Sequence, residues 1–314
     1  MGRVSDLRVP TYDDIRRAGE LVAPWVRRTP TVEVEVRSHR VMLKLELMQH
    51  AGSFKTRGAF TNVLSAPEPP ATLVAASGGN HGLAVAYAGH ALGIKTRIFV
   101  PETAPSVKVD AIAALGAEVD QVGTRYAEAL DASREVAERP GALALHAYDS
   151  WPTVCGQGTL GLEIAEQAPD VDTVLVAVGG GGLISGVANA LAGVDEAISV
   201  IGVEPASCPT MHRALESDGP VDVEVGGVAA DALGASRLGE IAFATATRLA
   251  IDSVLVSDEE IIEARRWLWR HVRMAAEPAG AAALAALLSG VYVPDDGERV
   301  CVVVCGGNAD PAGL

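Results

Sequence analysis

Apolar positions recur along this chain with two spacings, and the two spacings predict strands and helices. Short apolar runs rich in Val, Ile and Ala predict buried strands at 72–76, 96–100, 118–122, 142–146, 173–178, 199–204 and 300–304. Segments with apolar residues three and four apart predict helices at 81–92, 105–115, 126–138, 158–167 and 183–191. Because strands alternate with helices, the chain is expected to form right-handed crossovers and parallel sheets.

The two ends of the chain add further elements to this alternation. Thr11 to Val26 predicts an amphipathic helix, Val41 to Glu46 a strand, and Lys55 to Leu64 a second helix. Ser257 and Glu260 form a capping box that opens a helix over 258–275, and 279–288 predicts another. The region 205–248 has no regular period.

The pattern predicts an α/β protein with two open, mostly parallel twisted sheets and helices on both faces. The proline-rich loop Pro67–Pro70 is a candidate crossing between two domains. We expect a large domain formed by 1–67 and 142–314, and a small mobile domain formed by 72–141 that closes over the substrate.

Composition narrows the class of partner. The chain has 314 residues, of which 49% are hydrophobic, with a formal net charge of −15 and a pI of about 4.9. Nucleic acids and anionic membranes bind surfaces with clustered Lys and Arg, whereas this chain is strongly acidic. Neither is therefore expected as a partner. Two apolar stretches, 72–94 and 174–194, are long enough to suggest membrane spans, but a glycine-rich turn breaks each. Because residues 1–6 contain no apolar stretch, we expect no signal peptide, and we expect a cytoplasmic protein with no appended regulatory domain.

The four cysteines indicate neither a disulfide framework nor a zinc site. They are Cys155, Cys208, Cys301 and Cys305. Cys301 and Cys305 lie four residues apart in a predicted strand, a separation of roughly 13 Å, and cannot chelate one metal together. A reduced, cytoplasmic state is expected.

The candidate chemistry gathers at strand-to-helix junctions. Lys55 lies at such a junction, flanked by glycine and small residues. Two glycine-rich turns of the same kind follow at 77–81 and 179–182, and a third lies at 305–308. An amine, an anion cradle and two polar turns can hold an aldehyde cofactor that carries a phosphate.

Four consecutive glycines, Gly179, Gly180, Gly181 and Gly182, precede a predicted helix and suit a phosphate group. A Walker A loop is absent, and the third glycine of a dinucleotide fingerprint is replaced by Ser185. Glu204 lies roughly 20 residues further on, at the end of the next predicted strand, where dinucleotide enzymes carry their ribose-binding acid. A dinucleotide site therefore stays open as an alternative. It leaves Lys55 and Asn80 unexplained, whereas pyridoxal phosphate uses both.

Seven motifs resemble the serine/threonine dehydratase family of fold-type II, tryptophan-synthase-β-like pyridoxal phosphate enzymes. In chain order they are SFKTRGA (53–59), SGGNHG (77–82), GQGT (156–159), GGGGLISG (179–186), VEP (203–205), EPAGAAALAAL (277–287) and CGGN (305–308). The resemblance covers nearly the whole chain and implies that Lys55 forms a Schiff base with the cofactor and later moves the Cα proton. It also implies cofactor contacts from Phe54, Asn80 and Cys305, with the phosphate on Gly179 to Gly182.

The resemblance further implies that Ser77, Gly78, Gly79 and His81 belong to the turn that grips the substrate carboxylate. Asn80 would bind the ring hydroxyl, Phe54 would pack on one face of the ring, and Cys305 would face the pyridine nitrogen. Serine racemases carry a serine at the position of Gly78, so efficient racemisation is not expected here.

The resemblance also suggests a cation site. Glu204, Cys208 and Thr210 match the family's ligand positions, but a second carboxylate is missing. Such a set suits K⁺ better than Mg²⁺. A strand-end carboxylate satisfied by the backbone is the alternative for Glu204.

Together these features predict a homodimeric ammonia-lyase that converts L-threonine or L-serine by β-elimination to a 2-oxo acid and ammonia. Within the cofactor class, the alternatives are a hydroxyaspartate or phenylserine dehydratase and β-replacement as in cysteine synthases. Outside it, the alternatives are a dinucleotide-binding oxidoreductase or a ligand-binding protein without catalysis. Arg125 and Tyr126 are candidates for reading the substrate side chain, against a solvated loop position.

Overall fold

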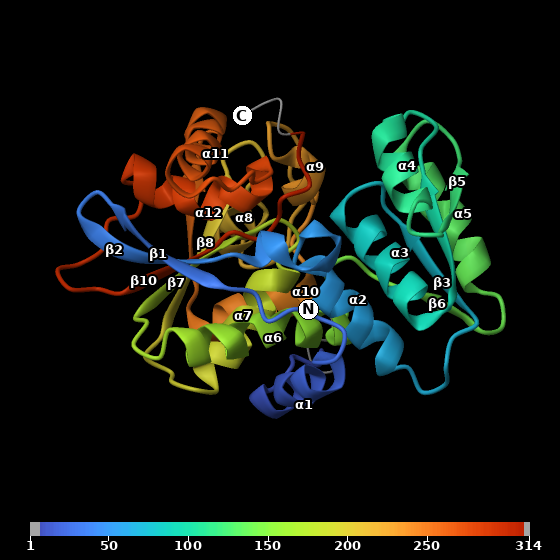
Figure 1. Cartoon of the computed structure of the whole chain (residues 1–314), viewed down its shortest axis with the longest axis horizontal. Coiled ribbons are helices and arrows are strands. Elements are labelled where there is room, and N and C mark those ends of the chain that lie inside the picture. The colour runs from blue at the N-terminus through green and yellow to red at the C-terminus, as the bar shows by residue number, and fades with distance from the viewer. Residues whose placement is uncertain (1–6, 311–314) are drawn as a thin grey trace.

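Two β-sheets organise residues 7–310, which are the residues that the computed structural model describes. One sheet has six strands in the order β1-β2-β10-β7-β8-β9, and the other has four in the order β5-β4-β3-β6. Neighbouring strands are parallel throughout, except for the antiparallel hairpin of β1 and β2. Helices lie on both faces of each sheet, so the predicted fold class is confirmed (Figure 1).

The strands are β1(Thr31–Val36), β2(His39–Lys44), β3(Thr72–Ala76), β4(Lys95–Val100), β5(Glu118–Gln121), β6(Ala142–Ala144), β7(Thr173–Ala177), β8(Ser199–Pro205), β9(Asp252–Val256) and β10(Val300–Val303). The α-helices are α1(Tyr12–Val22), α2(Lys55–Leu64), α3(Asn80–Leu92), α4(Ser106–Ala113), α5(Tyr126–Ala137), α6(Trp151–Gln167), α7(Gly182–Ala192), α8(Thr210–Glu216), α9(Ala230–Leu233), α10(Glu240–Leu249), α11(Asp258–Val272) and α12(Pro278–Ser289). Two 3₁₀ turns, η1(Glu46–Met48) and η2(His50–Gly52), precede α2.

The large lobe is the six-stranded sheet with its covering helices. Figure 1 shows α11 and α12 on one face and α6 and α7 on the other. Every residue of β7 is buried, as expected for a central parallel strand that is covered on both faces. The alanine-rich α12 is buried from Ala279 to Leu287, because small side chains let it lie close against the strands.

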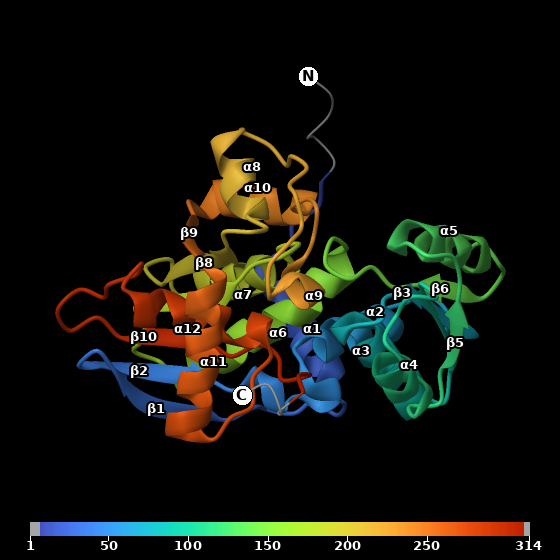
Figure 2. The ribbon, with the colours of Figure 1, turned by 90° about the horizontal axis from the view of Figure 1, so that it is seen from above.

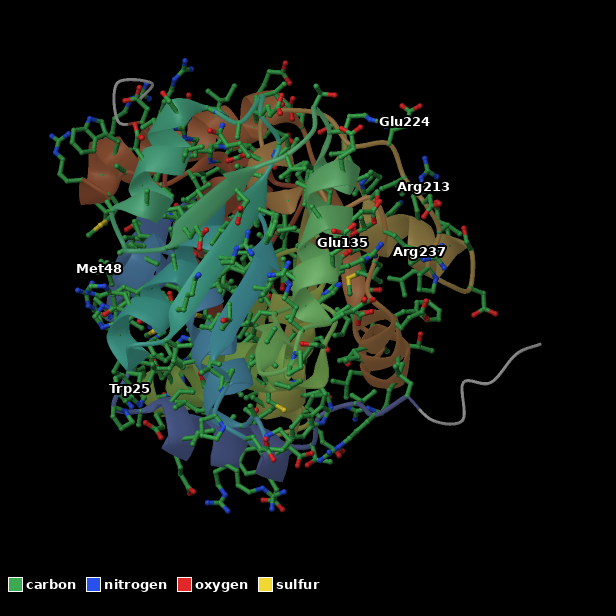
Figure 3. All side chains as sticks on the ribbon, turned by 90° about the vertical axis from the view of Figure 1, so that its right-hand side faces the viewer. Trp25, Met48, Glu135, Arg213, Glu224 and Arg237 are labelled. Carbon is green, nitrogen blue, oxygen red and sulfur yellow. The ribbon has the colours of Figure 1, made fainter. Side chains whose placement is uncertain are left out.

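The small lobe is the four-stranded sheet with α5 on one face and α3 and α4 on the other (Figure 2). Figure 3 turns this lobe toward the viewer, with Glu135 marking α5. The residues Ala142–Ala144 pair with Thr72–Val74, so β6 belongs to this sheet. The sequence assigns these residues to the large domain, because Pro140–Gly141 stops the predicted helix before them. In the structure the chain returns to the large lobe only after Ala144.

Several element boundaries differ from the sequence prediction, among them the end of α1, which lies at Val22 instead of Val26. The helix predicted at 158–167 begins at Trp151, because Pro152 lies in the first turn, where its missing N–H costs nothing. The strand predicted at 41–46 ends at Lys44, where η1 follows, and its partner β1 was not predicted. The helix predicted to end at 275 ends at Val272, before Arg273 in the left-handed region. Within residues 7–310, no helix is long and apolar enough to cross a membrane.

Candidate active site

Lys55 reaches the site from a sharp reversal of the chain. Ala51 and Gly52 have positive φ angles of 56° and 71°, and the extended Ser53 then pairs with Gly306 just after β10. This reversal places the first residue of α2 at the carboxyl end of a central strand, where ligands of open α/β sheets bind.

The amine of Lys55 is held by the segment that returns from the small lobe. Its Nζ donates a hydrogen bond of 2.7 Å to the carbonyl oxygen of Ala147. Burial lowers the pKa of Lys55 to about 8, against the opposing influence of Cys305 and Glu277. Roughly a tenth of the amine is therefore neutral at pH 7, and able to act as nucleophile or base, far more than for a lysine with an ordinary pKa.

The glycine cradle, Gly179–Gly182, joins β7 to the N-terminus of α7. Gly181 has a φ of +84°, which favours glycine. A Cβ at Gly179 would lie 2.9 Å from the backbone of Leu233, and one at Gly182 would lie 2.6 Å from the carbonyl oxygen of Tyr148. At Gly180 a Cβ would overlap the ring of Tyr148. The backbone of the cradle therefore lies so close to its neighbours that only glycine fits at these positions.

Asn80 begins α3 and faces the large lobe. Its Nδ2 donates to Glu277 Oε1 at 2.6 Å, and its Oδ1 accepts from Asn308 Nδ2 at 2.7 Å. The structure thus joins the predicted SGGNH and CGGN turns and adds Glu277, to which the sequence analysis gave no role. The signal for Glu277 was its place in the EPAG motif.

Phe54 and Cys305 lie next to each other, and Phe54 directly precedes Lys55. The N–H of Phe54 donates to the carbonyl oxygen of Cys305 at 3.2 Å, and Lys55 Nζ lies 5.1 Å from the centroid of the Phe54 ring. Cys305 is buried, and its thiol donates to the Ala279 carbonyl oxygen at 3.4 Å. Burial raises the pKa of Cys305 far above its ordinary value, so the thiol is neutral.

The predicted substrate turn lies between β3 and α3, continuous with Asn80. The hydroxyl of Ser77 accepts a hydrogen bond of 3.3 Å from the N–H of Gly79. The Nε2 of His81 lies 2.9 Å from the Leu145 carbonyl oxygen, and burial lowers the pKa of His81 to about 3. His81 is therefore neutral and held by the backbone. Gly78 is half-buried in the same turn.

Glu204 is satisfied by hydrogen-bond donors of the protein. Its carboxylate accepts from the hydroxyls of Thr210 and Ser253 and from the N–H groups of Met211 and His212. The same Thr210 hydroxyl also lies within hydrogen-bond distance of the Gly179 carbonyl oxygen, so the two acceptors share its single proton and the carboxylate is linked to the glycine cradle. Cys208 is buried beside it. Within the described part of the chain, no cluster of three or more His, Cys, Asp or Glu could hold a metal ion.

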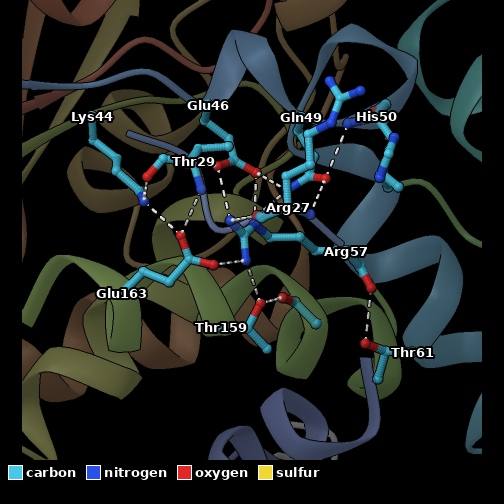
Figure 4. Close-up of polar contacts among 12 residues, drawn as sticks. Arg27, Thr29, Lys44, Glu46, Gln49, His50, Arg57, Thr61, Thr159 and Glu163 are labelled. Atoms are coloured by element: carbon cyan, nitrogen blue, oxygen red, sulfur yellow. Dashed lines mark hydrogen bonds and ion pairs between the residues drawn. The ribbon is translucent and has the colours of Figure 1, made fainter. Parts of the chain in front are cut away.

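A buried cluster of charged residues, which the sequence does not predict, anchors α2 to η1, β2 and α6 (Figure 4). Its members are Arg57, Glu46, Glu163 and Lys44. Arg57 bonds Glu46 at 2.6 and 3.0 Å and Glu163 at 2.7 Å, and Lys44 bonds Glu163 at 2.5 Å. Although burial disfavours its charge, the two carboxylates raise the pKa of Arg57 above its ordinary value. The cluster fixes the helix two residues after Lys55.

Two observations test whether these residues fit pyridoxal phosphate. No hydrogen bond within residues 7–310 uses the N–H groups of Gly179 to Gly182, and three of these four glycines are buried at a helix N-terminus. The hydroxyl of Ser53, next to Phe54, is buried and without a partner among the described residues. Unmet donors in the cradle suit a phosphate, and the amine of Lys55 suits an aldehyde, so the residues fit this cofactor.

Comparison with known proteins agrees with this fit. The family model described as "Pyridoxal-phosphate dependent enzyme" matches residues 22–306. An L-threonine ammonia-lyase of Thermotoga maritima is 37% identical over 96% of this chain and 76% of its own length. A phenylserine dehydratase of Ralstonia pickettii is 37% identical over 99% of this chain and 97% of its own. Maize serine racemase, at 31% identity, superimposes with a TM-score of 0.91 over 97% of this chain and 95% of that one.

Proposed function

This chain belongs to the family of pyridoxal-phosphate dependent enzymes, and we propose that it is a dehydratase of a small β-hydroxy L-amino acid, threonine or serine. Its products would be a 2-oxo acid and ammonia. The observation that carries the proposal is the amine of Lys55, with a pKa of about 8, near Cys305 at the carboxyl end of β10 and near Glu277, to which Asn80 of the small lobe bonds. The relative named L-threonine ammonia-lyase supports the substrate class.

We assign the cofactor contacts to the residues just described. Lys55 would bind the aldehyde carbon, the glycine cradle the phosphate, and Asn80 the ring hydroxyl. When bound, pyridoxal phosphate withdraws electrons from the substrate's Cα and so makes the Cα proton acidic. Cys305 would present a neutral thiol to the ring nitrogen, because burial keeps the thiol protonated.

The chain's own residues then bind the substrate and move protons. The turn Ser77–His81 would hold the substrate carboxylate with the Ser77 hydroxyl and backbone N–H groups. The amine of Lys55, set free when the substrate's amino group takes its place, would take the Cα proton. As the Cβ–O bond breaks, the hydroxyl would leave as water together with that proton. The resulting enamine takes up water and releases ammonia and the 2-oxo acid. Because the position of Gly78 carries no second acid or base, protonation of the opposite face of Cα is disfavoured.

We also propose that the small lobe moves as a small domain and closes over the substrate. Lys108 of α4 and Asp231 of α9 form an ion pair between the two lobes. Gly79, in the substrate turn, lies against the backbone of Asp231. Breaking this ion pair would favour the open state.

Three finer properties belong to the same proposal. A homodimer is supported by the exposed side chains of Met48 and Trp269 and is tested by light scattering. A K⁺ ion at Glu204, Cys208 and Thr210 would compete with the hydrogen bonds of that carboxylate; comparing activity in KCl and choline chloride tests it. A cytoplasmic location rests on the sequence alone, and cell fractionation tests it.

The deciding experiment is an assay of 2-oxo acid release by the purified protein loaded with pyridoxal phosphate. We expect release from L-threonine or L-serine, with the rate ratio naming the substrate. L-threo-3-phenylserine and 3-hydroxyaspartate distinguish the alternative dehydratases. Cofactor binding without release from any β-hydroxy amino acid would contradict the proposed reaction, and O-acetylserine with sulfide would then test β-replacement.

A further inference from the structure

We propose that Glu277 is a positioning residue that fixes the Asn80 amide in the one orientation that donates to the cofactor's ring hydroxyl. The inference rests on the proposed function, since it concerns the same cofactor. It assigns a role to a buried carboxylate that the reaction itself does not use.

The orientation of Asn80 follows from a chain of hydrogen bonds with a fixed direction. The chain begins at the carbonyl oxygen of Ala51, which can only accept, and which accepts from Asn308 Nδ2 at 2.8 Å. The same nitrogen donates to Asn80 Oδ1 at 2.7 Å, so this atom of Asn80 is the oxygen. Asn80 Nδ2 must then face Glu277 Oε1, at 2.6 Å. Flipping the Asn80 amide would set nitrogen against nitrogen and oxygen against oxygen.

This arrangement leaves one donor of Asn80 available. An amide nitrogen carries two hydrogens, and Glu277 takes one of them. Asn80 is 8% exposed and Glu277 4% exposed, so water has little access to replace either partner. The second N–H of Asn80 is thereby held for a ligand oxygen.

The packing around Glu277 prevents the carboxylate from moving away. A Cβ at Gly306 would overlap Glu277 Oε1, and the N–H of Glu277 donates to the carbonyl oxygen of Gly306 at 3.2 Å. Glu277 is also the N-cap residue of α12, yet its side chain makes no capping hydrogen bond. Helix capping, the ordinary structural reason for a polar residue at this position, therefore does not account for the carboxylate.

The charged groups around Glu277 come from several elements. Lys55 of α2 and Lys108 of α4 favour its ionised form, whereas Asp231 of α9 disfavours it. Burial, the largest influence, raises the pKa of Glu277 to about 7. Keeping a carboxylate here costs stability, and such a cost is typical of functional sites.

The chain of hydrogen bonds from Ala51 through Asn308 and Asn80 to Glu277 also joins the two lobes. Asn80 begins α3 of the small lobe, whereas Ala51, Glu277 and Asn308 belong to the large lobe (Figure 1). The contact with the ring hydroxyl is therefore aligned by the lobe that carries Lys55, the cradle and Cys305.

A double-mutant cycle between Glu277 and Asn80 tests the proposal. The affinity for pyridoxal phosphate is measured by absorbance titration of the apo-forms of wild type, E277A, N80A and E277A/N80A. Because E277A removes the acceptor of the Asn80 N–H, we expect E277A and N80A each to weaken binding by roughly 10- to 100-fold, the scale of a lost hydrogen bond to a charged group. We expect the double variant to bind no more weakly than N80A alone, because Glu277 acts through Asn80. E298A, which removes a partly buried carboxylate that accepts from the Tyr292 hydroxyl, is the matched control and should bind like wild type.

Additive losses in the cycle, or an unchanged affinity and visible spectrum in E277A, would overturn the proposal. Thermal unfolding of the apo-forms separates misfolding from lost positioning, and N308A keeps the test open should E277A not fold. If N308A folds and binds the cofactor like wild type, the directional chain is refuted. If the wild type releases 2-oxo acid but the variants do not behave as expected, only the role of Glu277 is refuted and the proposed function stands. If the wild type does not bind pyridoxal phosphate, the proposed function itself is refuted.

Discussion

Replacing Arg57 by methionine tests whether the buried charge cluster excludes water, as its low exposure indicates. The Arg57 side chain is 1% exposed and the Glu46 side chain 0% exposed. The guanidinium supplies both of the short charged hydrogen bonds of Glu46, which would keep only Thr29 Oγ1 at 2.7 Å and Gln49 Nε2 at 3.4 Å. Removing one partner of a buried ion pair typically costs about 3–5 kcal/mol, and we expect R57M to lose stability in that range. Glu163 stays paired with Lys44 and adds little to the loss.

The free energy of unfolding is measured by urea denaturation of the apo-protein, with R57M compared to the double variant R57M/E46Q. The double variant should recover part of the loss, because it also removes the stranded charge. R213M is the matched control: Arg213 forms an exposed pair with Glu216, and its loss should cost less than about 1 kcal/mol (Figure 3). An R57M loss as small as that of R213M would show that the cluster is solvated and refute the reasoning.

Three further predictions concern the site and the two lobes. G180A places a methyl group against the Tyr148 ring and should weaken cofactor affinity at least roughly tenfold, measured by absorbance titration, whereas Y148A/G180A should recover part of it. The rate of cofactor capture by the apo-protein should rise with pH through about 8, because only the neutral Lys55 amine attacks; a flat stopped-flow profile from pH 6.5 to 9.5 would contradict this. K108A breaks the ion pair with Asp231 and should raise KM more than it lowers kcat in steady-state assays; equal changes in both would count against closure.

Local sequence patterns predicted most of the elements that deliver the site. The segments at 55–64 and 72–76 form α2 and β3 within the expected bounds, because the helix and strand periods there are clear. The parallel order was predictable from the alternation of strands and helices. The hairpin strand β1 was not predicted, although Thr31–Val36 alternates valine with glutamate as an edge strand with one solvated face does.

The buried charge cluster could not be predicted, since its partners lie far apart along the chain. Arg57 meets Glu163 106 positions away, and Lys44 meets it 119 positions away. Each residue taken singly is a charged residue of the kind that normally faces solvent. Only the packing of η1, α2 and α6 shows that they face one another.

Residues joined by a motif were easier to find than residues joined by a contact. The motifs indicated Lys55, Asn80 and Cys305, and their chemical roles stay predictions. Glu277 lies in one of the same motifs, but its bond to Asn80 spans 197 positions and has no local signature. The hypothesis that Glu204 binds a cation competes in the structure with four protein donors to that carboxylate.

The most direct test of the central claim is borohydride reduction of the cofactor-loaded protein, followed by peptide mapping by mass spectrometry. We predict a yellow wild-type protein that reduction bleaches, with the pyridoxyl group recovered on the peptide that contains Lys55. K55A should carry no such group and release no 2-oxo acid, while its apo-form unfolds as the wild type does. A label on another lysine, or a wild type that stays colourless with added cofactor, would contradict the assignment of Lys55 as the residue that holds pyridoxal phosphate.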